Sequence, residues 1–149
     1  MRQTKSQHGF SLIELLIAVA IIGIVAAIAV PNLLASRKAS NEASAVSSVR
    51  TIITGQITYH QTIGNNREYA PNLSALYTNR QIVDAVLASG TKSGYTLSVT
   101  VPASLDTFTC DANPVTFRTS GDRHFFSDTS GVIRYNLTAP ATLGDPPVQ

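Results

Sequence analysis

The sequence is poor in cysteine. Cys110 is the only one in 149 residues. A single thiol excludes a disulfide within the chain and a thiolate metal cluster built from one copy of it. We therefore interpret Cys110 as a small, partly buried hydrophobic side chain. A reactive thiol and a bridge to another chain are the alternatives.

Charged residues are also scarce, at 13% of the chain, and the formal net charge is +2. Two of the eleven basic residues, Arg2 and Lys5, lie within the first nine positions, which leaves nine basic against nine acidic residues in the remainder. A nucleic-acid-binding surface needs a basic excess or a basic cluster, and only Arg37 and Lys38 stand together. High-affinity binding of nucleic acid is not expected.

No group of residues has the spacing of a catalytic or metal site. The histidines, His8, His60 and His124, have no partner at a recognised distance along the sequence. Asp122 and Asp128 flank a predicted strand but lack the closely spaced oxygen ligands of a calcium loop. A glycine-rich phosphate loop is also missing. We therefore expect neither an enzyme nor a bound cofactor or metal.

What the sequence does contain is a long apolar run, "GFSLIELLIAVAIIGIVAAIAVP", from Gly9 to Pro31. Between Phe10 and Val30 the strongly polar residues are Ser11 and Glu14 alone. A run of about 18 or more apolar residues predicts a membrane-spanning helix. A carboxylate within such a helix costs a few kcal/mol near the bilayer centre and less toward its surface. The position of Glu14 therefore requires an explanation.

Two ordinary interpretations of this run leave something unexplained. A secretory signal has a basic start, an apolar stretch of roughly 7–15 residues and a small-residue cleavage site. Here the apolar stretch is longer and contains Glu14. A plain signal anchor fits the length but gives the acid no role. The flanking charges do not decide the orientation, because Arg2 and Lys5 on one side face Arg37 and Lys38 on the other.

A third interpretation comes from the residues "KSQHGFSLIELLIAVAIIGIVAAIAVP". They resemble the class III signal of type IV pilins and the related pseudopilins: a basic leader ending in Gly9, then Phe10, then an apolar helix with Glu14 at the fifth mature position. The resemblance implies that residues 1–9 are a leader peptide. It also implies that a prepilin peptidase cuts between Gly9 and Phe10 on the cytoplasmic side and methylates the Phe10 amine.

The same resemblance gives two positions in the helix a meaning. Pro31 falls where many members of this family have a helix-bending proline, and the segment from Gly23 to Pro31 corresponds to one that loosens when subunits enter a filament. Proline removes a backbone donor and clashes with the preceding turn, and glycine lowers helix propensity. An ordinary kink in a membrane helix is the alternative.

Cleavage would create a cationic amine on Phe10, four residues from Glu14. Opposite charges attract strongly in a medium of low dielectric constant, but their desolvation costs a comparable amount, so such a pair sets register more than it adds stability. Our hypothesis is that Glu14 pairs with the Phe10 amine of an adjacent subunit and fixes the stagger between them. In the lipid-held monomer, a shallow carboxylate solvated by headgroups is compatible with the same sequence.

The helical pattern continues beyond the apolar run. Residues 10–30 are predicted to form a transmembrane or filament-core helix, and residues 31–62 its amphipathic continuation. Apolar residues recur there at spacings of three and four, on a single helical face, at Ala39, Ala43, Val46, Val49, Ile53 and Ile57.

Residues 63–149 are predicted to form a globular head. A loop over 63–75 precedes a short helix in "RQIVDAVLASG", and "GYTLSVTV", "VTFR", "HFFSD" and "VIRYN" are predicted strands separated by turn sequences. The fold class is therefore α+β: a long helix packed on a small antiparallel sheet of about four strands, similar to the pilin fold. Many pilins close a C-terminal loop with two cysteines, so the single cysteine leaves the "SGVIRYN" strand to hold this region by hydrogen bonds.

These features predict a structural subunit of a type IV pilus that polymerises through its N-terminal helix. The expected partners are copies of itself, the prepilin peptidase, the pilus assembly machinery of the inner membrane and, for the monomer, the membrane. The expected location is the inner membrane, as a single-pass protein, and then the extracellular pilus. One alternative is a major pseudopilin of a type II secretion system, although the calcium loop implied for that group is missing. Another is a membrane-anchored binding module, in which Glu14 would be dispensable.

Overall fold

The structure, a computed structural model, describes residues 9–148. The predicted leader lies outside these residues apart from Gly9, and His8 lies outside them too. The first element is one continuous helix, α1 (Leu12–Thr62), of 51 residues. The chain divides into two compact units, and the boundary falls within α1 between Ala35 and Ser36.

In the second unit, α1 buries one face. Val49 and Ile53 lie on it as predicted, whereas Ala39, Ala43 and Ile57 of the predicted stripe are exposed. The buried face is rotated toward polar positions, because two polar side chains find partners in the interior and are themselves buried. Its members are Glu42, Ala45, Ser48, Val49, Ile52, Ile53, Gly55 and Gln56.

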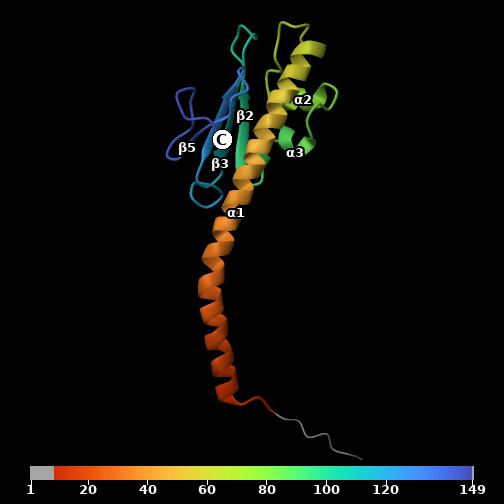
Figure 1. Cartoon of the computed structure of the whole chain (residues 1–149). Helices are drawn as coiled ribbons and strands as arrows, with labels where there is room; N and C mark the ends of the chain where they lie inside the picture. Colours follow the sequence, from red (N-terminus) through yellow and green to blue (C-terminus); the bar gives the residue numbers. More distant parts are fainter. Residues whose placement is uncertain (1–8, 149) are drawn as a thin grey trace, which may run out of the picture. The chain divides into compact units, whose positions relative to one another are not determined.

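A five-stranded sheet packs against this face of α1 (Figure 1). The strands follow one another in the order β1-β2-β3-β4-β5, and every neighbouring pair is antiparallel. This arrangement confirms the predicted α+β class, with one strand more than the approximate number expected. The strands are β1 (Thr91–Lys92), β2 (Tyr95–Thr100), β3 (Thr109–Pro114), β4 (His124–Asp128) and β5 (Arg134–Asn136).

One predicted strand is wrong. The segment "VTFR" forms a turn in which Phe117 makes only an isolated bridge with Gly121. The strand at this place in the sheet is instead β3, "TCDANP", whose Asp, Asn and Pro are residue types depleted in strands. Pairing with β2 on one side and β4 on the other overrides that weak preference, and Cys110 and Ala112 point into the core.

Two short helices lie between α1 and the sheet in sequence. The helix α2 (Leu73–Thr78) begins inside the segment predicted as a loop, with the Asn72 side chain accepting a hydrogen bond from the Ala75 amide (2.8 Å). The helix α3 (Ala85–Ala88) lies within the predicted helical segment and is capped by Asp84. It stops before Gly90, which adopts the left-handed φ of +78° that glycine tolerates best.

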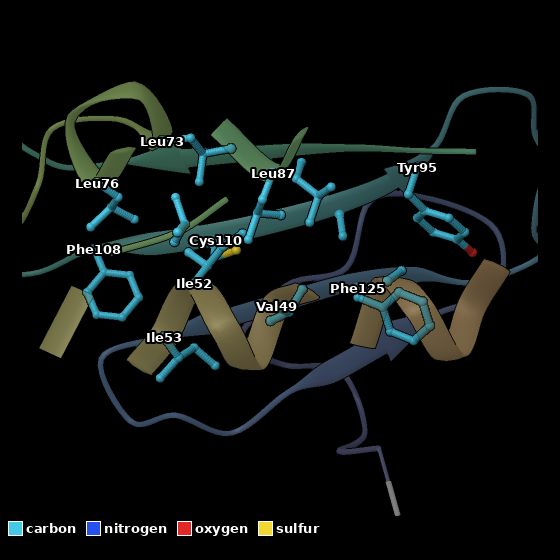
Figure 2. Packing of buried hydrophobic residues seen from close by; sticks show 14 of the residues in the cluster. Val49, Ile52, Ile53, Leu73, Leu76, Leu87, Tyr95, Phe108, Cys110 and Phe125 are labelled. Atoms are coloured by element: carbon cyan, nitrogen blue, oxygen red, sulfur yellow. The ribbon is translucent and has the colours of Figure 1, made fainter. Parts of the chain in front are cut away.

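The core of the head lies between α1, the two short helices and the inner face of the sheet (Figure 2). It includes Tyr95, whose hydroxyl donates to the carbonyl oxygen of Arg123 (2.8 Å). The largest apolar side chains that are almost completely buried are Tyr95, Phe108, Phe125, Ile52, Leu76, Leu87 and Val49.

Candidate functional site

The first part of α1 exposes its apolar side chains in the single chain. The large apolar residues between Leu12 and Leu34 each retain 50–80% of their accessible surface. By length and composition, α1 contains a stretch long and apolar enough to cross a membrane. A contiguous apolar surface of this size marks contact with lipid or with another protein.

The residues proposed for processing lie just before this helix. Gly9, Phe10 and Ser11 precede the first helical residue, Leu12, and have no regular secondary structure. The Phe10 side chain is 90% exposed, and no heavy atom outside its chain neighbours lies within 4 Å of a Cβ built on Gly9. The Gly9–Phe10 bond is therefore in open, non-helical backbone, the condition that favours proteolytic cleavage.

Glu14 has a local partner that the sequence analysis missed. Its Oε2 atom accepts a hydrogen bond from the backbone amide of Ser11 at 2.9 Å. Ser11 is the residue before the helix, and Glu14 is the third helical residue, so the pair forms half of a capping box. The Ser-x-x-Glu spacing of Ser11 and Glu14 was the signal available in the sequence. In the single chain the carboxylate therefore stabilises the start of its own helix.

Gly23 and Pro31 both lie inside α1, and the helix continues without interruption through them. No heavy atom beyond the helix's own turn lies within 4 Å of a Cβ built on Gly23. The structure therefore brings neither residue into contact with Glu14 or with the head; both mark intrinsically weak points of a helix whose neighbours are supplied by the environment.

A cluster of charges holds the sheet against α1 at the start of the second unit. Glu42, only 7% exposed, accepts the Asp122 amide at 2.8 Å and the Arg123 Nε–H at 2.7 Å. One turn earlier on α1, the Lys38 ammonium group donates to the Asp122 carboxylate at 2.8 Å. The sequence analysis placed Glu42 on the solvent face of the helix. Its partners lie about 80 residues away, and no local pattern identifies them.

The C-terminal segment is held without a disulfide. The Tyr135 amide donates to the Pro146 carbonyl oxygen at 3.0 Å, and the Val148 amide donates to that of Ile133 at 2.8 Å. Residues 146–148 therefore lie along the outer edge of β5 and cover its hydrogen-bonding groups. Backbone hydrogen bonds to the "SGVIRYN" strand thus hold this region, as the sequence analysis expected.

Asp145 fixes the turn that returns the chain to this edge. Its carboxylate accepts from the Thr142 amide (2.6 Å), the Thr142 hydroxyl (2.9 Å) and the Asn136 side-chain amide (2.8 Å). These bonds, led by that from the Thr142 amide, lower the pKa of Asp145 below its usual 3.8. Because the pKa is lower in the folded chain, the stabilisation is present above about pH 3.8 and is lost as the pH falls through the folded value.

We expect the C-terminal segment to loosen in acid while the core of the sheet stays intact. The measurement is a pH titration of the Val148 methyl resonances by NMR, from about pH 6 to pH 2, with the Leu97 methyls as an internal control. Replacing Asp145 with asparagine should loosen the segment at every pH, because the introduced amide group cannot accept all three bonds. Val148 shifts that stay constant below pH 3.8 in the wild type would contradict this assignment.

The remaining candidate residues have structural environments. Cys110 is fully buried, and burial raises the pKa of its thiol to about 12, which confirms the small hydrophobic residue and disfavours a reactive thiolate. His60 stacks on Tyr69 at 4.5 Å between ring centroids, and His124 Nδ1 lies 2.7 Å from the Asn113 side-chain oxygen. Within residues 9–148, no three potential metal ligands gather at one place.

Comparison with known proteins agrees with this geometry at the N-terminus. The family model described as "Prokaryotic N-terminal methylation motif" matches residues 4–30. The chain is 45% identical over 72 residues to the type IV wide pilus major component PilA4 of Thermus thermophilus, a match that covers 48% of this chain and 53% of that protein. It is 36% identical over 85 residues to the type IV major pilin protein PilA of Myxococcus xanthus (53% and 39%).

A relative from another system is also similar. Over 49 residues the chain is 39% identical to the type II secretion system core protein G of Escherichia coli, covering 33% of this chain and 34% of that protein. The chain thus spans between a third and about half of the length of these curated relatives. Comparison with solved structures finds no match.

An exposed apolar helix that begins with a methylation motif and ends in a small α+β head defines a class of filament-forming, membrane-inserted proteins. The chain belongs to the type IV pilin and pseudopilin superfamily.

Proposed function

We propose that the chain is a structural subunit of a type IV pilus rather than a secretion pseudopilin. The observation that carries this proposal is the exposed apolar part of α1, preceded by an accessible Gly9–Phe10 bond and started by Glu14. The choice of pilus is supported by the length of similarity. The matches to the pilus components extend over 72 and 85 residues, whereas that to the secretion protein stops after 49.

Processing is the first step of the proposed function. A prepilin peptidase cuts between Gly9 and Phe10 and methylates the new amine, and the apolar helix keeps the product in the inner membrane as a single-pass protein. Removal of the leader takes away Arg2 and Lys5, so that the helix starts with one amine and one carboxylate. The subunit then leaves the membrane for an extracellular pilus.

Assembly is the second step, and the capping contact defines its starting state. In the single chain the Glu14 carboxylate is satisfied by its own Ser11 amide. As helices pack into a bundle, they exchange apolar contact with lipid for apolar contact with one another. We propose that Glu14 then turns to the Phe10 amine of an adjacent subunit, which selects one stagger. Loosening between Gly23 and Pro31 would let the helix adapt to its neighbours.

The experiment that tests the processing step is mass spectrometry of the mature N-terminus. We expect a chain that begins with methylated Phe10. A mature chain that still begins at Met1, or one that begins near Val30, would overturn the proposed cleavage.

Electron microscopy of cell-surface fibres, with antibody against residues 63–149, tests the assembly step. Labelled long fibres support the pilus. Short fibres that appear only when a secretion system is overproduced would favour the pseudopilin, and a correctly processed chain that forms no fibre would favour a membrane-anchored binding module.

A further inference from the structure

The head has two opposite ends along α1. The proximal end, where α1 enters the head, comprises α1 residues 37–42 and the loop 115–122, which are joined by the Lys38–Asp122 ion pair and by a hydrogen bond from the Asn41 side chain to the Ser120 carbonyl oxygen (2.8 Å). The distal end comprises the loops 63–70, 101–108 and 128–132. Figure 1 shows the loops 63–70 and 101–108 beside the C-terminal end of α1, and the loop 115–122 at the other end of the sheet.

Hydrogen bonds and strand register support this division. The Tyr69 amide donates to the Leu105 carbonyl oxygen at 3.0 Å, which joins two of the distal loops. The register places Thr100, Thr109 and Asp128 side by side at the distal end of the sheet. Helical rise separates the two ends of the head by roughly 40 Å along α1. This distance is several Debye lengths at physiological salt, so the two ends of one head do not attract each other.

The proximal end carries positive charge that has no counter-ion within residues 9–148. Lys38 and Asp122 neutralise each other, as do Glu42 and Arg123. The exposed Arg37 and Arg118 form no ion pair. The Arg118 guanidinium lies 5.4 Å from the centroid of the Phe117 ring, which is itself 39% exposed, and the neighbouring Val115 is 58% exposed. This end is therefore a basic surface with an apolar centre.

The distal end carries the opposite charge. Glu68, Asp106 and Asp128 form no ion pair within the described chain, and Arg67 is the one basic residue in the same loops. Asp106 accepts a hydrogen bond from the Ser104 hydroxyl, and Asp128 accepts from the Ser130 amide at 2.9 Å, so two of the carboxylates are held in place by their own turns. An exposed apolar side chain, Val132, lies in the third loop.

We propose that the proximal end of one head docks on the distal end of the head of a second copy of this chain. Basic and apolar groups on one surface meet acidic and apolar groups on the other, which steers association and rejects the two like-charged pairings. The two surfaces lie at opposite ends, so the contact is heterologous and does not close into a ring by itself, which makes it a filament contact. The inference rests on the proposed function, and it adds a head-to-head contact to the contact between helices.

The test uses two full-length charge-reversal variants and their mixture. One variant carries Arg37→Glu with Arg118→Glu and has two acidic ends. The other carries Glu68→Lys with Asp106→Lys and has two basic ends. We expect each variant alone to yield several-fold fewer sheared filaments than the wild type. Co-expressed in one cell, they should form mixed filaments at close to the wild-type yield, because each acidic end then meets a basic one.

Rescue by mixing shows at the same time that both variants fold and are processed. An Arg80→Glu variant, which changes an exposed arginine outside both surfaces, is the matched control and should assemble normally. Normal yields from both single variants, or no rescue in the mixture, would overturn the proposed contact. A wild-type chain that forms no filaments would instead count against the proposed function, so the two failures are distinguishable.

Discussion

Cells that express Glu14→Ala should lose their filaments while the chain still enters the membrane. The substitution removes the carboxylate that accepts the Ser11 amide in the single chain and, in our proposal, the partner of the neighbouring Phe10 amine. Loss of one member of a buried ion pair costs about 3–5 kcal/mol, because the other charge is left without compensation. We therefore expect sheared filament yield to fall by at least about tenfold, since about 1.4 kcal/mol corresponds to each factor of ten.

The Glu14→Gln variant separates the two roles of this side chain. Glutamine accepts the Ser11 amide as glutamate does, because both residue types complete a capping box. It carries no charge for an amine on a neighbouring subunit. If the charge sets the stagger, Glu14→Gln fails as severely as Glu14→Ala. Wild-type filament yield from Glu14→Gln would show that the cap alone is required, and normal membrane fractionation of both variants is the control for insertion.

The parts of this molecule that could be predicted from sequence are those determined locally. The apolar run from Phe10 to Val30 predicts its own environment, because nearly every residue in it prefers lipid or an apolar neighbour to water. The strand Tyr95–Thr100 alternates apolar and polar residues, and its burial follows that alternation. Gly90 ends a short helix for a reason that concerns its own backbone alone.

The parts that were missed depend on partners far away in the sequence. Strand β3 has a poor β composition and forms because β2 and β4 flank it with matching registers. Glu42 is polar, so the helical pattern assigned it to solvent, yet it binds groups about 80 residues away. The Asn72 cap of α2 was a local signal, and the proline and asparagines of "IGNNREYAPNLSA" obscured it by favouring a loop.

Gln56 provides the second large expected effect. It is fully buried on α1, and its side-chain amide forms two hydrogen bonds with the backbone of Ala70, donating to the carbonyl oxygen at 2.9 Å and accepting from the amide at 2.8 Å. Ala70 is also fully buried. Replacing Gln56 with leucine keeps an apolar side chain of similar length but leaves both Ala70 groups without partners. Each unsatisfied buried group costs about 1–3 kcal/mol, so we expect the free energy of unfolding to fall by about 2–4 kcal/mol.

Urea unfolding of the detergent-solubilised full chain, followed by tyrosine fluorescence, measures this change, because the chain has five tyrosines and no tryptophan. Thr54→Ala, an exposed change two residues earlier on α1, is the matched control and should stay within about 0.5 kcal/mol of the wild type. Gln56→Glu adds a test of sign. Its introduced carboxyl group can donate to the Ala70 carbonyl oxygen only when protonated, so its pKa rises on folding and the variant should gain stability relative to the wild type as the pH falls. If Gln56→Leu unfolds at the wild-type urea concentration, the two hydrogen bonds to Ala70 do not hold the loop after α1, and the docking of α2 must depend on its apolar contacts alone.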